Sequence, residues 1–326
     1  MKPIMIYITS ALLFLLIGRT YYRYALKKKI LDHPSHRSSH RNPTVRGGGI
    51  IFVAGVLIAY FLYLYPAYPY FLTGFLILSA TGFADDKLQL SPKIRFPLQL
   101  VSLVLILYDA GLWTSEWPLW LKAIVLIVSL GFINAYNFMD GINGITASYS
   151  AALVFLFLWL NRETRLWPEP FFVLLLISIM VFGHFNVRKK ALMFAGDVGT
   201  MALSAVLLFV GLRFALELQS PVLLLLVGVY GTDSALTIIR RIFMGENILA
   251  AHRHHAYQKL VDRCGWSHLQ VSLAYGLIQW LTGLAVILGQ WYKKPLNWQW
   301  LAVSGGLAIF VLIYYFIIHR ACEDRI

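Results

Sequence analysis

Residues 196–216 read GDVGTMALSAVLLFVGLRFAL. This run carries few charges and is long enough to cross a bilayer as one helix, which takes about 20 residues. Similar apolar runs recur along the chain, and we predict transmembrane helices at residues 4–22, 49–65, 68–84, 97–113, 118–137, 142–160, 169–187, 196–216, 220–239, 270–290 and 297–318. The sequence therefore predicts an all-α, polytopic membrane protein with about eleven transmembrane helices, in which residues 1–326 form a single domain.

The composition of the chain excludes a soluble domain. Of its 326 residues, 59% are hydrophobic and 13% are charged, and the mean hydropathy is +0.68, whereas soluble domains average about half and a quarter. Most of the 28 Lys and Arg residues fall in alternate loops, which predicts that these loops are cytoplasmic and that the N-terminus lies outside. The net charge of +13 then forms a basic face that suits lipid headgroups and phosphate substrates, not nucleic acid.

Four carboxylates lie at the predicted cytoplasmic ends of three helices. Asp85 and Asp86 follow the third apolar run, Asp140 follows the fifth, and Asp197 opens the eighth. Proteins hold Mg²⁺ with few carboxylates when phosphate oxygens and water complete its coordination, so this placement predicts a metal site for a diphosphate substrate. Taken singly, Asp197 is equally well explained as the N-cap of its helix and Asp85 as a partner of Lys87.

Amide side chains mark the end of the fifth run. Asn134, Asn137 and Asp140 are spaced by three, which places them on one helix face, and an amide inside a span needs a polar partner or cavity. The following Gly141-Ile142-Asn143-Gly144 predicts a tight turn whose N–H groups can approach a nucleotide closely. The alternative is a plain turn between two helices.

Two further cytoplasmic loops carry groups suited to phosphate. Gly47-Gly48-Gly49 follows Arg46 and opens the second run, so its N–H groups favour anion binding, although close helix packing also explains the glycines. His252-Arg253-His254-His255 stands in the last long loop. A Zn²⁺ site is one interpretation, but without thiolates these side chains suit phosphate hydrogen bonding better.

One carboxylate lies inside a predicted span. Asp233 is in the ninth run, two turns before Arg240. An intramembrane carboxylate indicates a functional site by default. A structural link between helices explains Asp233 about as well, and both interpretations stay open at this point.

Five motifs in order resemble those of the polyprenyl-phosphate N-acetylhexosamine-1-phosphate transferase superfamily. They are Phe83-x-Asp85-Asp86, Ser91-Pro92-Lys93-x-Arg95-Phe96, Asn137-Phe138-Met139-Asp140-Gly141-Ile142-Asn143-Gly144, Phe194-x-Gly196-Asp197-x-Gly199 and His252-Arg253-His254-His255. The resemblance extends from about Pro34 to Gln258. It implies a phosphoglycosyltransferase that moves a sugar-1-phosphate from a UDP-sugar to a lipid phosphate and releases UMP.

The resemblance also implies roles for individual residues. The metal ligands would be Asp197 and Asp86, holding Mg²⁺ or Mn²⁺ as its substitute. The nucleotide would be served by Asn137, Asp140 and Asn143, and the ring of Phe194 would stack on uracil. The catalytic set that we expect is Asp85, Asp86, Asp197, His254 and His255. The substrate-binding set that we expect is Asn137, Asp140, Asn143, Phe194, Lys93, His252, Arg253 and Arg46.

Two differences from the peptidoglycan enzymes indicate which branch of the superfamily the chain resembles. The peptidoglycan enzymes carry three adjacent histidines and an Asp where Asn143 stands, whereas His252-Arg253-His254-His255 is similar to the branch that starts O-antigen or capsule glycans. We therefore expect a UDP-amino sugar and undecaprenyl phosphate as partners, a multi-pass location in the bacterial inner (plasma) membrane, and a role in lipopolysaccharide or other cell-envelope glycan synthesis. The sugar and the oligomeric state stay open, with a homodimer as one candidate.

The alternative function from another class is a multi-pass transporter or flippase for a lipid-linked sugar. Such a protein predicts internal repeats and polar groups near the middle of the membrane. The polar groups of this chain gather at one predicted face, and its sequence shows no evident repeat. The sequence therefore favours the enzyme.

Overall fold

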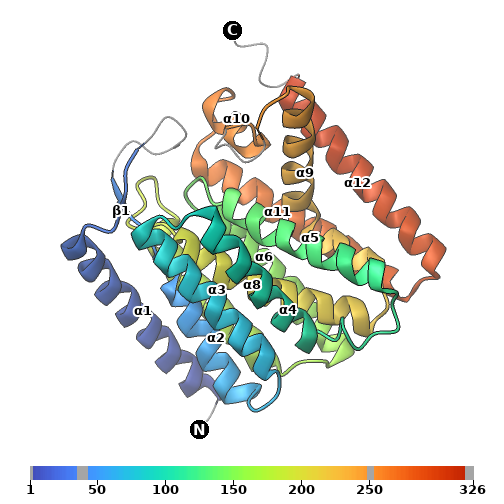
Figure 1. Cartoon of the computed structure of the whole chain (residues 1–326), viewed down its shortest axis with the longest axis horizontal. Coiled ribbons are helices and arrows are strands. Elements are labelled where there is room, and N and C mark those ends of the chain that lie inside the picture. Colours follow the sequence, from blue (N-terminus) through green and yellow to red (C-terminus); the bar gives the residue numbers. More distant parts are fainter. Residues whose placement is uncertain (1–2, 35–42, 248–252, 320–326) are drawn as a thin grey trace.

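The computed structural model describes residues 3–34, 43–247 and 253–319. Most of this chain is helical, as predicted (Figure 1). The α-helices are α1 (Pro3–Lys28), α2 (Ile50–Tyr63), α3 (Pro69–Leu88), α4 (Pro92–Asp109), α5 (Leu119–Phe138), α6 (Ile145–Thr164), α7 (Glu169–Asn186), α8 (Gly196–Glu217), α9 (Gly228–Phe243), α10 (Ala256–Asp262), α11 (His268–Leu288) and α12 (Leu296–His319). The 3₁₀ segments are η1 (Pro221–Val227) and η2 (Trp291–Lys293), and β1 (Leu31–Asp32) pairs antiparallel with β2 (Thr44–Val45).

The helices confirm an all-α polytopic membrane protein. Among the described residues, eight helical segments are long and apolar enough to cross a membrane: α1, α5, α6, α7, α8, η1 with α9, α11 and α12. Each of the other predicted runs coincides with a shorter or more polar helix, namely α2, α3 and α4. The count of eleven crossings and the outside position of the N-terminus stay predictions.

Three boundaries differ from the prediction. The run 220–239 divides into η1 and α9, a break that hydropathy does not reveal because 3₁₀ and α-helices place apolar residues at similar spacings. Helix α4 begins at Pro92, earlier than the apolar run, since proline is favoured in the first turn of a helix. The short helix α10 was missed because seven residues are far too few for the apolar runs that predict a transmembrane helix.

Helix α8 is the centre of the bundle. It is the most buried of the candidate spans and packs against α2, α3, α5 and α6, whereas α1 and α12 are mostly exposed. Small residues allow the close approach, as is typical within lipid. A Cβ atom added to Gly49 would lie 2.0 Å from the Cα of Gly199, and one added to Gly82 would lie 2.6 Å from the Asp197 carbonyl oxygen. Backbones of α2 and α3 therefore touch α8 beside Asp197.

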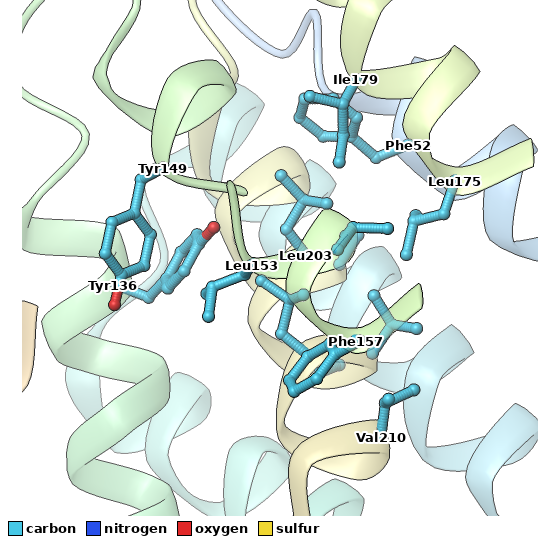
Figure 2. Packing of buried hydrophobic residues seen from close by; sticks show 14 of the residues in the cluster. Phe52, Tyr136, Tyr149, Leu153, Phe157, Leu175, Ile179, Leu203 and Val210 are labelled. Atoms are coloured by element: carbon cyan, nitrogen blue, oxygen red, sulfur yellow. The ribbon is translucent and has the colours of Figure 1, made fainter. Parts of the chain in front are cut away.

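The interior between these helices is filled by aromatic and branched side chains. Figure 2 shows Phe52 of α2, Ile179 of α7, and Leu203 of α8 within this buried cluster. The Phe52 ring meets the Phe182 ring edge to face, with 4.8 Å between centroids. Such packing fixes the helices relative to one another, and so fixes the ends on which the charged residues stand.

The charged loops lie at one end of this bundle. In Figure 1, the β1 hairpin and α10 are both at the upper end, while α1 begins at the lower end. Two contacts tie the upper loops to helix ends: residue pair Val45 and Met193 forms a parallel bridge beside α8, and the Tyr257 hydroxyl of α10 donates to the Phe138 carbonyl of α5 at 3.0 Å. The predicted gathering of polar loops on one face is therefore present.

Candidate active site

Asp86 of α3 caps the start of α8. Its Oδ1 accepts the Asp197 N–H at 2.8 Å and its Oδ2 accepts the Val198 N–H at 3.1 Å. Gly196 makes the approach possible, because it has φ +71° and an added Cβ would lie 2.4 Å from Asp86 Oδ2. The sequence left open that Asp197 is the cap of its own helix. The structure assigns the cap to Asp86, so the Asp197 side chain is directed to other partners.

Arg46 joins two of the predicted carboxylates. Its Nε lies 2.5 Å from Asp86 Oδ1 and its Nη2 lies 2.8 Å from Asp197 Oδ1. The strand before it is held by the Phe194 N–H, which donates to the Val45 carbonyl at 2.8 Å. Arg46 directly follows β2, which positions its guanidinium. The guanidinium offsets the negative charge of two buried carboxylates.

The glycines that follow Arg46 serve packing. The Gly48 N–H donates to the Phe194 carbonyl at 2.8 Å and the Gly49 N–H to the Ala195 carbonyl at 2.9 Å. The expectation that these N–H groups bind an anion is therefore wrong for Gly48 and Gly49. The alternative, close packing, is confirmed. The glycine N–H groups are used in hydrogen bonds that hold this loop against the segment leading into α8.

Asp85 faces a different arginine. Arg95 Nη1 of α4 lies 3.0 Å from Asp85 Oδ2 and 4.0 Å from Asp197 Oδ2. The Asp85 Oδ1 accepts the Leu90 N–H at 2.6 Å, and Arg95 links the Asp85 carboxylate to that of Asp197. The sequence suggested Lys87 as the partner of Asp85, but Lys87 is exposed and Arg95 holds that place. Asp85, Asp86, Asp197, Arg46 and Arg95 form one group, which we call the carboxylate cluster.

Asn137 of α5 joins this cluster. Its Nδ2 donates to Asp197 Oδ1 at 2.9 Å and to Thr200 Oγ1 at 2.8 Å. The two other members of the predicted polar stripe diverge from it. Asn134 exchanges hydrogen bonds with Gln99 of α4, and Asp140 lies beyond the end of α5 and accepts the Thr146 hydroxyl at 2.5 Å. Burial raises the pKa of Asp140 to about 6.

Asn143 holds the turn after Asp140 in place. Its Nδ2 donates to the carbonyls of Arg188 and Lys189, at 2.9 and 3.3 Å. Asn186, at the end of α7, completes the arrangement by accepting the Gly144 N–H at 2.7 Å and donating to the Met193 carbonyl at 3.0 Å. The sequence argument missed Asn186. Its only signal was an amide at the end of an apolar run, just before a basic loop.

The histidine loop, residues 253–255, makes separate pairs with acidic residues. Arg253 Nη2 lies 2.7 Å from Asp262 Oδ1, and His254 Nε2 lies 3.1 Å from Glu246 Oε1. His255 is buried, and its Nδ1 lies 3.2 Å from Asp233 Oδ1. Burial lowers the pKa of His254.

The remaining predicted site residues are more scattered. Phe194 is half-buried beside the start of α8, and Lys93 is exposed in the first turn of α4. His252 lies outside the described residues. The structure therefore brings together Asp85, Asp86, Asp197, Arg46 and Asn137, with Phe194 adjoining them through the backbone. The histidine loop adjoins the end of α5 through the Tyr257 hydroxyl.

The cluster fits a divalent cation held partly by substrate. Within residues 3–34, 43–247 and 253–319, no group of three or more His, Cys, Asp or Glu is arranged as a metal site, so the Zn²⁺ interpretation has no support there. The Asp85 and Asp197 carboxylates lie at the same Arg95 guanidinium, and like charges this close favour a cation beside them. Two carboxylates with phosphate oxygens and water are a usual ligand set for Mg²⁺.

The fold and the cluster define a multi-pass membrane protein with a group of paired carboxylates and arginines at helix ends. Residues 68–215 match the family described as Glycosyl transferase family 4. The chain is 27% identical to the probable undecaprenyl-phosphate N-acetylglucosaminyl 1-phosphate transferase of Bacillus subtilis (strain 168). The alignment covers 96% of this chain and 91% of that relative.

Enterobacterial relatives match along a similar length. The undecaprenyl-phosphate alpha-N-acetylglucosaminyl 1-phosphate transferase of Escherichia coli (strain K12) is 25% identical over 95% of this chain and 88% of its own. The enzyme of the same name from Yersinia pestis is 24% identical over 94% of this chain and 88% of its own length. The family match and these relatives support the resemblance to the polyprenyl-phosphate N-acetylhexosamine-1-phosphate transferase superfamily, and the relatives' names give phosphoglycosyltransferase as the enzyme class.

Proposed function

We propose that the protein transfers N-acetylhexosamine-1-phosphate, or a related amino-sugar-1-phosphate, from a UDP-sugar to undecaprenyl phosphate. The products are a polyprenyl diphosphate sugar and UMP. One observation carries the proposal: Arg46 and Arg95 both contact Asp197, and Arg95 also pairs with Asp85, at the end of the bundle where the basic loops gather. Mixed positive and negative groups of this kind suit a diphosphate and a cation together.

Mg²⁺ is the cation that we propose, with Mn²⁺ as a substitute. Asp197 and Asp85 would hold it, and it would neutralise charge on the transferring phosphoryl group. The sequence named Asp86 as the second ligand. We now favour Asp85, because both Asp86 oxygens are held by backbone N–H groups of α8, whereas Asp85 Oδ2 is paired with the side chain of Arg95, which can turn to a phosphate instead. Asp86 then acts by fixing where Asp197 stands.

The chemistry of the acceptor favours a direct reaction. A phosphate monoester has a second pKa of about 6, so the lipid phosphate is already mostly dianionic at neutral pH. Its oxygen attacks the phosphorus next to the sugar, and the bond from that phosphorus to the UMP oxygen breaks. Arg46 and Arg95 offset the charge, while Asp85 positions the acceptor or takes a residual proton. A covalent aspartyl-phosphate is the alternative route.

The surrounding residues suit the rest of the donor. Phe194 stands three residues before Asp197 along the chain and is half-buried, and we assign its ring to stacking on uracil. Asp140 and Asn143 border the turn that closes the same end of the bundle. We assign Lys93, Arg253, His254 and His255 to the phosphates or the sugar. The site would face the cytoplasm of a bacterial inner membrane, since the loops around it are basic.

A labelled donor tests the reaction. We would supply purified full-length protein with undecaprenyl phosphate and UDP-N-acetylglucosamine labelled at the phosphorus nearest the sugar. The proposal expects the label in the lipid product and unlabelled UMP in solution. Label recovered in UDP would show plain glycosyl transfer and would overturn the mechanism.

The sugar and the pathway follow from a second measurement. A panel of UDP-sugars with the same acceptor identifies the donor, and the preferred donor decides between O-antigen, capsule and other envelope glycans. The transferase names of the relatives favour this enzyme over a flippase. A flippase would move lipid-linked sugar between leaflets of a vesicle and would leave every UDP-sugar intact.

A further inference from the structure

Asp233 is a buried carboxylate in α9 with four hydrogen-bond donors around it. Its Oδ1 lies 3.2 Å from His255 Nδ1, 3.0 Å from the Ala256 N–H and 3.3 Å from the Thr237 hydroxyl. Its Oδ2 accepts the Tyr275 hydroxyl of α11 at 2.7 Å. Asp233 therefore joins α9, α11 and the histidine loop at the residue where α10 begins.

These contacts bear on the two interpretations left open by the sequence. Among the described residues, the four hydrogen-bond donors around Asp233 do not include Arg240. One of these donors is His255, which directly precedes α10. A carboxylate beside His255 determines which nitrogen of the imidazole ring carries the proton, in addition to joining α9 and α11.

The hydrogen bond has a direct chemical consequence. An ionised carboxylate only accepts hydrogen bonds, so His255 must carry its proton on Nδ1. In the neutral ring the lone pair is then on Nε2, so the carboxylate determines which ring nitrogen is the hydrogen-bond acceptor. A second group that orients a histidine in this way is a general device for fixing its tautomer and direction.

We propose that Asp233, supported by Tyr275, is a positioning residue that fixes the tautomer and placement of His255. The inference deepens the proposed function and rests on it, because it gives His255 a part in sugar-phosphate transfer. Asp233 itself does not touch substrate. The Ala256 N–H on the same oxygen ties this orientation to the start of α10.

The competing explanation is a purely structural link. Such a link needs only an acceptor of the right shape, and asparagine offers one. Positioning needs the carboxylate, since the amide of asparagine can also turn its NH₂ group toward the ring and favour the other tautomer. Asp233→Asn therefore separates the two explanations while keeping the size of the side chain.

The experiment measures kcat, KM for the UDP-sugar and thermal stability of full-length Asp233→Asn, Asp233→Glu and Tyr275→Phe. The matched control is Glu163→Gln, a carboxylate that accepts the Tyr292 hydroxyl away from the site. We expect Asp233→Asn to lower kcat by about a hundredfold with KM within about threefold, as expected when an interaction is made only in the transition state. Asp233→Glu should recover part of kcat, and Glu163→Gln should leave it unchanged.

Three outcomes would overturn the inference. The first is a stable Asp233→Asn protein with the kcat of the wild type. The second is an equal loss in the Asn and Glu variants together with a lower melting temperature, which marks a structural link. Should Asp233→Asn not fold, Tyr275→Phe decides, since it removes one donor from the same carboxylate: a kcat lowered about threefold or more supports positioning, and an unchanged kcat overturns it. Failure of the wild type to transfer label would instead refute the proposed function.

Discussion

The carboxylate cluster and the histidine loop lie at the same end of the molecule but are built differently. In the cluster, Asp197 Oδ1 is shared by Arg46 and Asn137, and the Asp197 carboxyl also meets Asp85. In the histidine loop, each side chain has a different acidic neighbour: Asp262 for Arg253, Glu246 for His254 and Asp233 for His255. The cluster is centred on one shared carboxylate, whereas each side chain of the histidine loop meets its own acidic residue.

This difference has an energetic meaning. Groups that share partners act as a unit, so removing one disturbs all of them and the effects of mutations do not add. Separate pairs add more nearly independently, and their burial decides how much each contributes. His255 is buried with Asp233 whereas His254 is partly exposed, so two residues that look equivalent in sequence should differ in effect.

The largest effect should come from Asp197→Asn. The change removes the charge from the residue that joins Arg46, Asn137 and the Asp85 carboxyl. We expect turnover to fall at least about a thousandfold, on the order of 4 kcal/mol, because charge neutralisation at a metal-bound diphosphate is lost. The measurement is initial rate against Mg²⁺ concentration. Chelation of Mg²⁺ should abolish wild-type turnover, and added Mg²⁺ or Mn²⁺ should restore it.

Asp109→Asn is the matched control for this variant. Asp109 ends α4 and accepts the Phe71 N–H at 2.7 Å, so it is also a partly buried carboxylate at a helix end, away from the cluster. Its turnover should equal that of the wild type. Near-normal turnover of Asp197→Asn at saturating Mg²⁺ would contradict the assignment of the cluster as the reaction site.

The second prediction separates the histidines. His255→Ala should lower turnover by about a hundredfold and His254→Ala by about tenfold, since the buried ring has a fixed orientation and the partly exposed one does not. His184→Ala is the control, because His184 is exposed at the end of α7 and contacts Arg188. Equal losses at 254 and 255 would show that the loop works as one unit, like the cluster. Control of the rate by added Zn²⁺ would instead support a metal site.

Much of the cluster could be predicted from the sequence. Carboxylates and helix ends are visible as charges that interrupt apolar runs, which is how Asp85, Asp86 and Asp197 were selected. The pairing within the cluster could not be predicted, because it depends on backbone contacts. Asp86 can cap α8 because Gly196 and Gly82 leave room for α3 to lie close to it. The spacing of residues in the sequence does not reveal this close contact.

The limits of sequence reasoning are clearest at Arg95 and Asp233. The sequence suggested the nearby Lys87 as the partner of Asp85. The partner is Arg95, because α4 packs beside α3. Asp233 could be marked as unusual only by its position inside an apolar run. Its partner lies beyond a long loop, so the pair joins residues that share no periodicity. Helix identity follows from local composition, whereas partners follow from packing.

The third prediction tests whether the cluster depends on the close approach of helices. Gly49→Ala places a Cβ 2.0 Å from the Cα of Gly199, so α2 and α8 must separate. We expect a loss of about 1–3 kcal/mol, typical of overpacking, which lowers the melting temperature by several degrees. Gly131→Ala is the control on α5, where an added Cβ meets nothing within 4 Å. An unchanged melting temperature for Gly49→Ala would show that the contact is loose.

The smallest effect should come from Glu246→Gln, which removes the charged partner of His254. The Arg241 hydrogen bond holds the pKa of Glu246 below its ordinary value, so this side chain is ionised at neutral pH. Burial holds the pKa of His254 below its ordinary value, so the ring is mostly neutral at pH 8 and gains charge as the pH falls. The pair is therefore weak at pH 8, and the variant should lose less than about threefold in turnover there. The loss should grow toward pH 6, because the protonated ring then misses its carboxylate. A loss above tenfold at pH 8, measured in the same labelled-donor assay, would place His254 in a network as tightly connected as the carboxylate cluster.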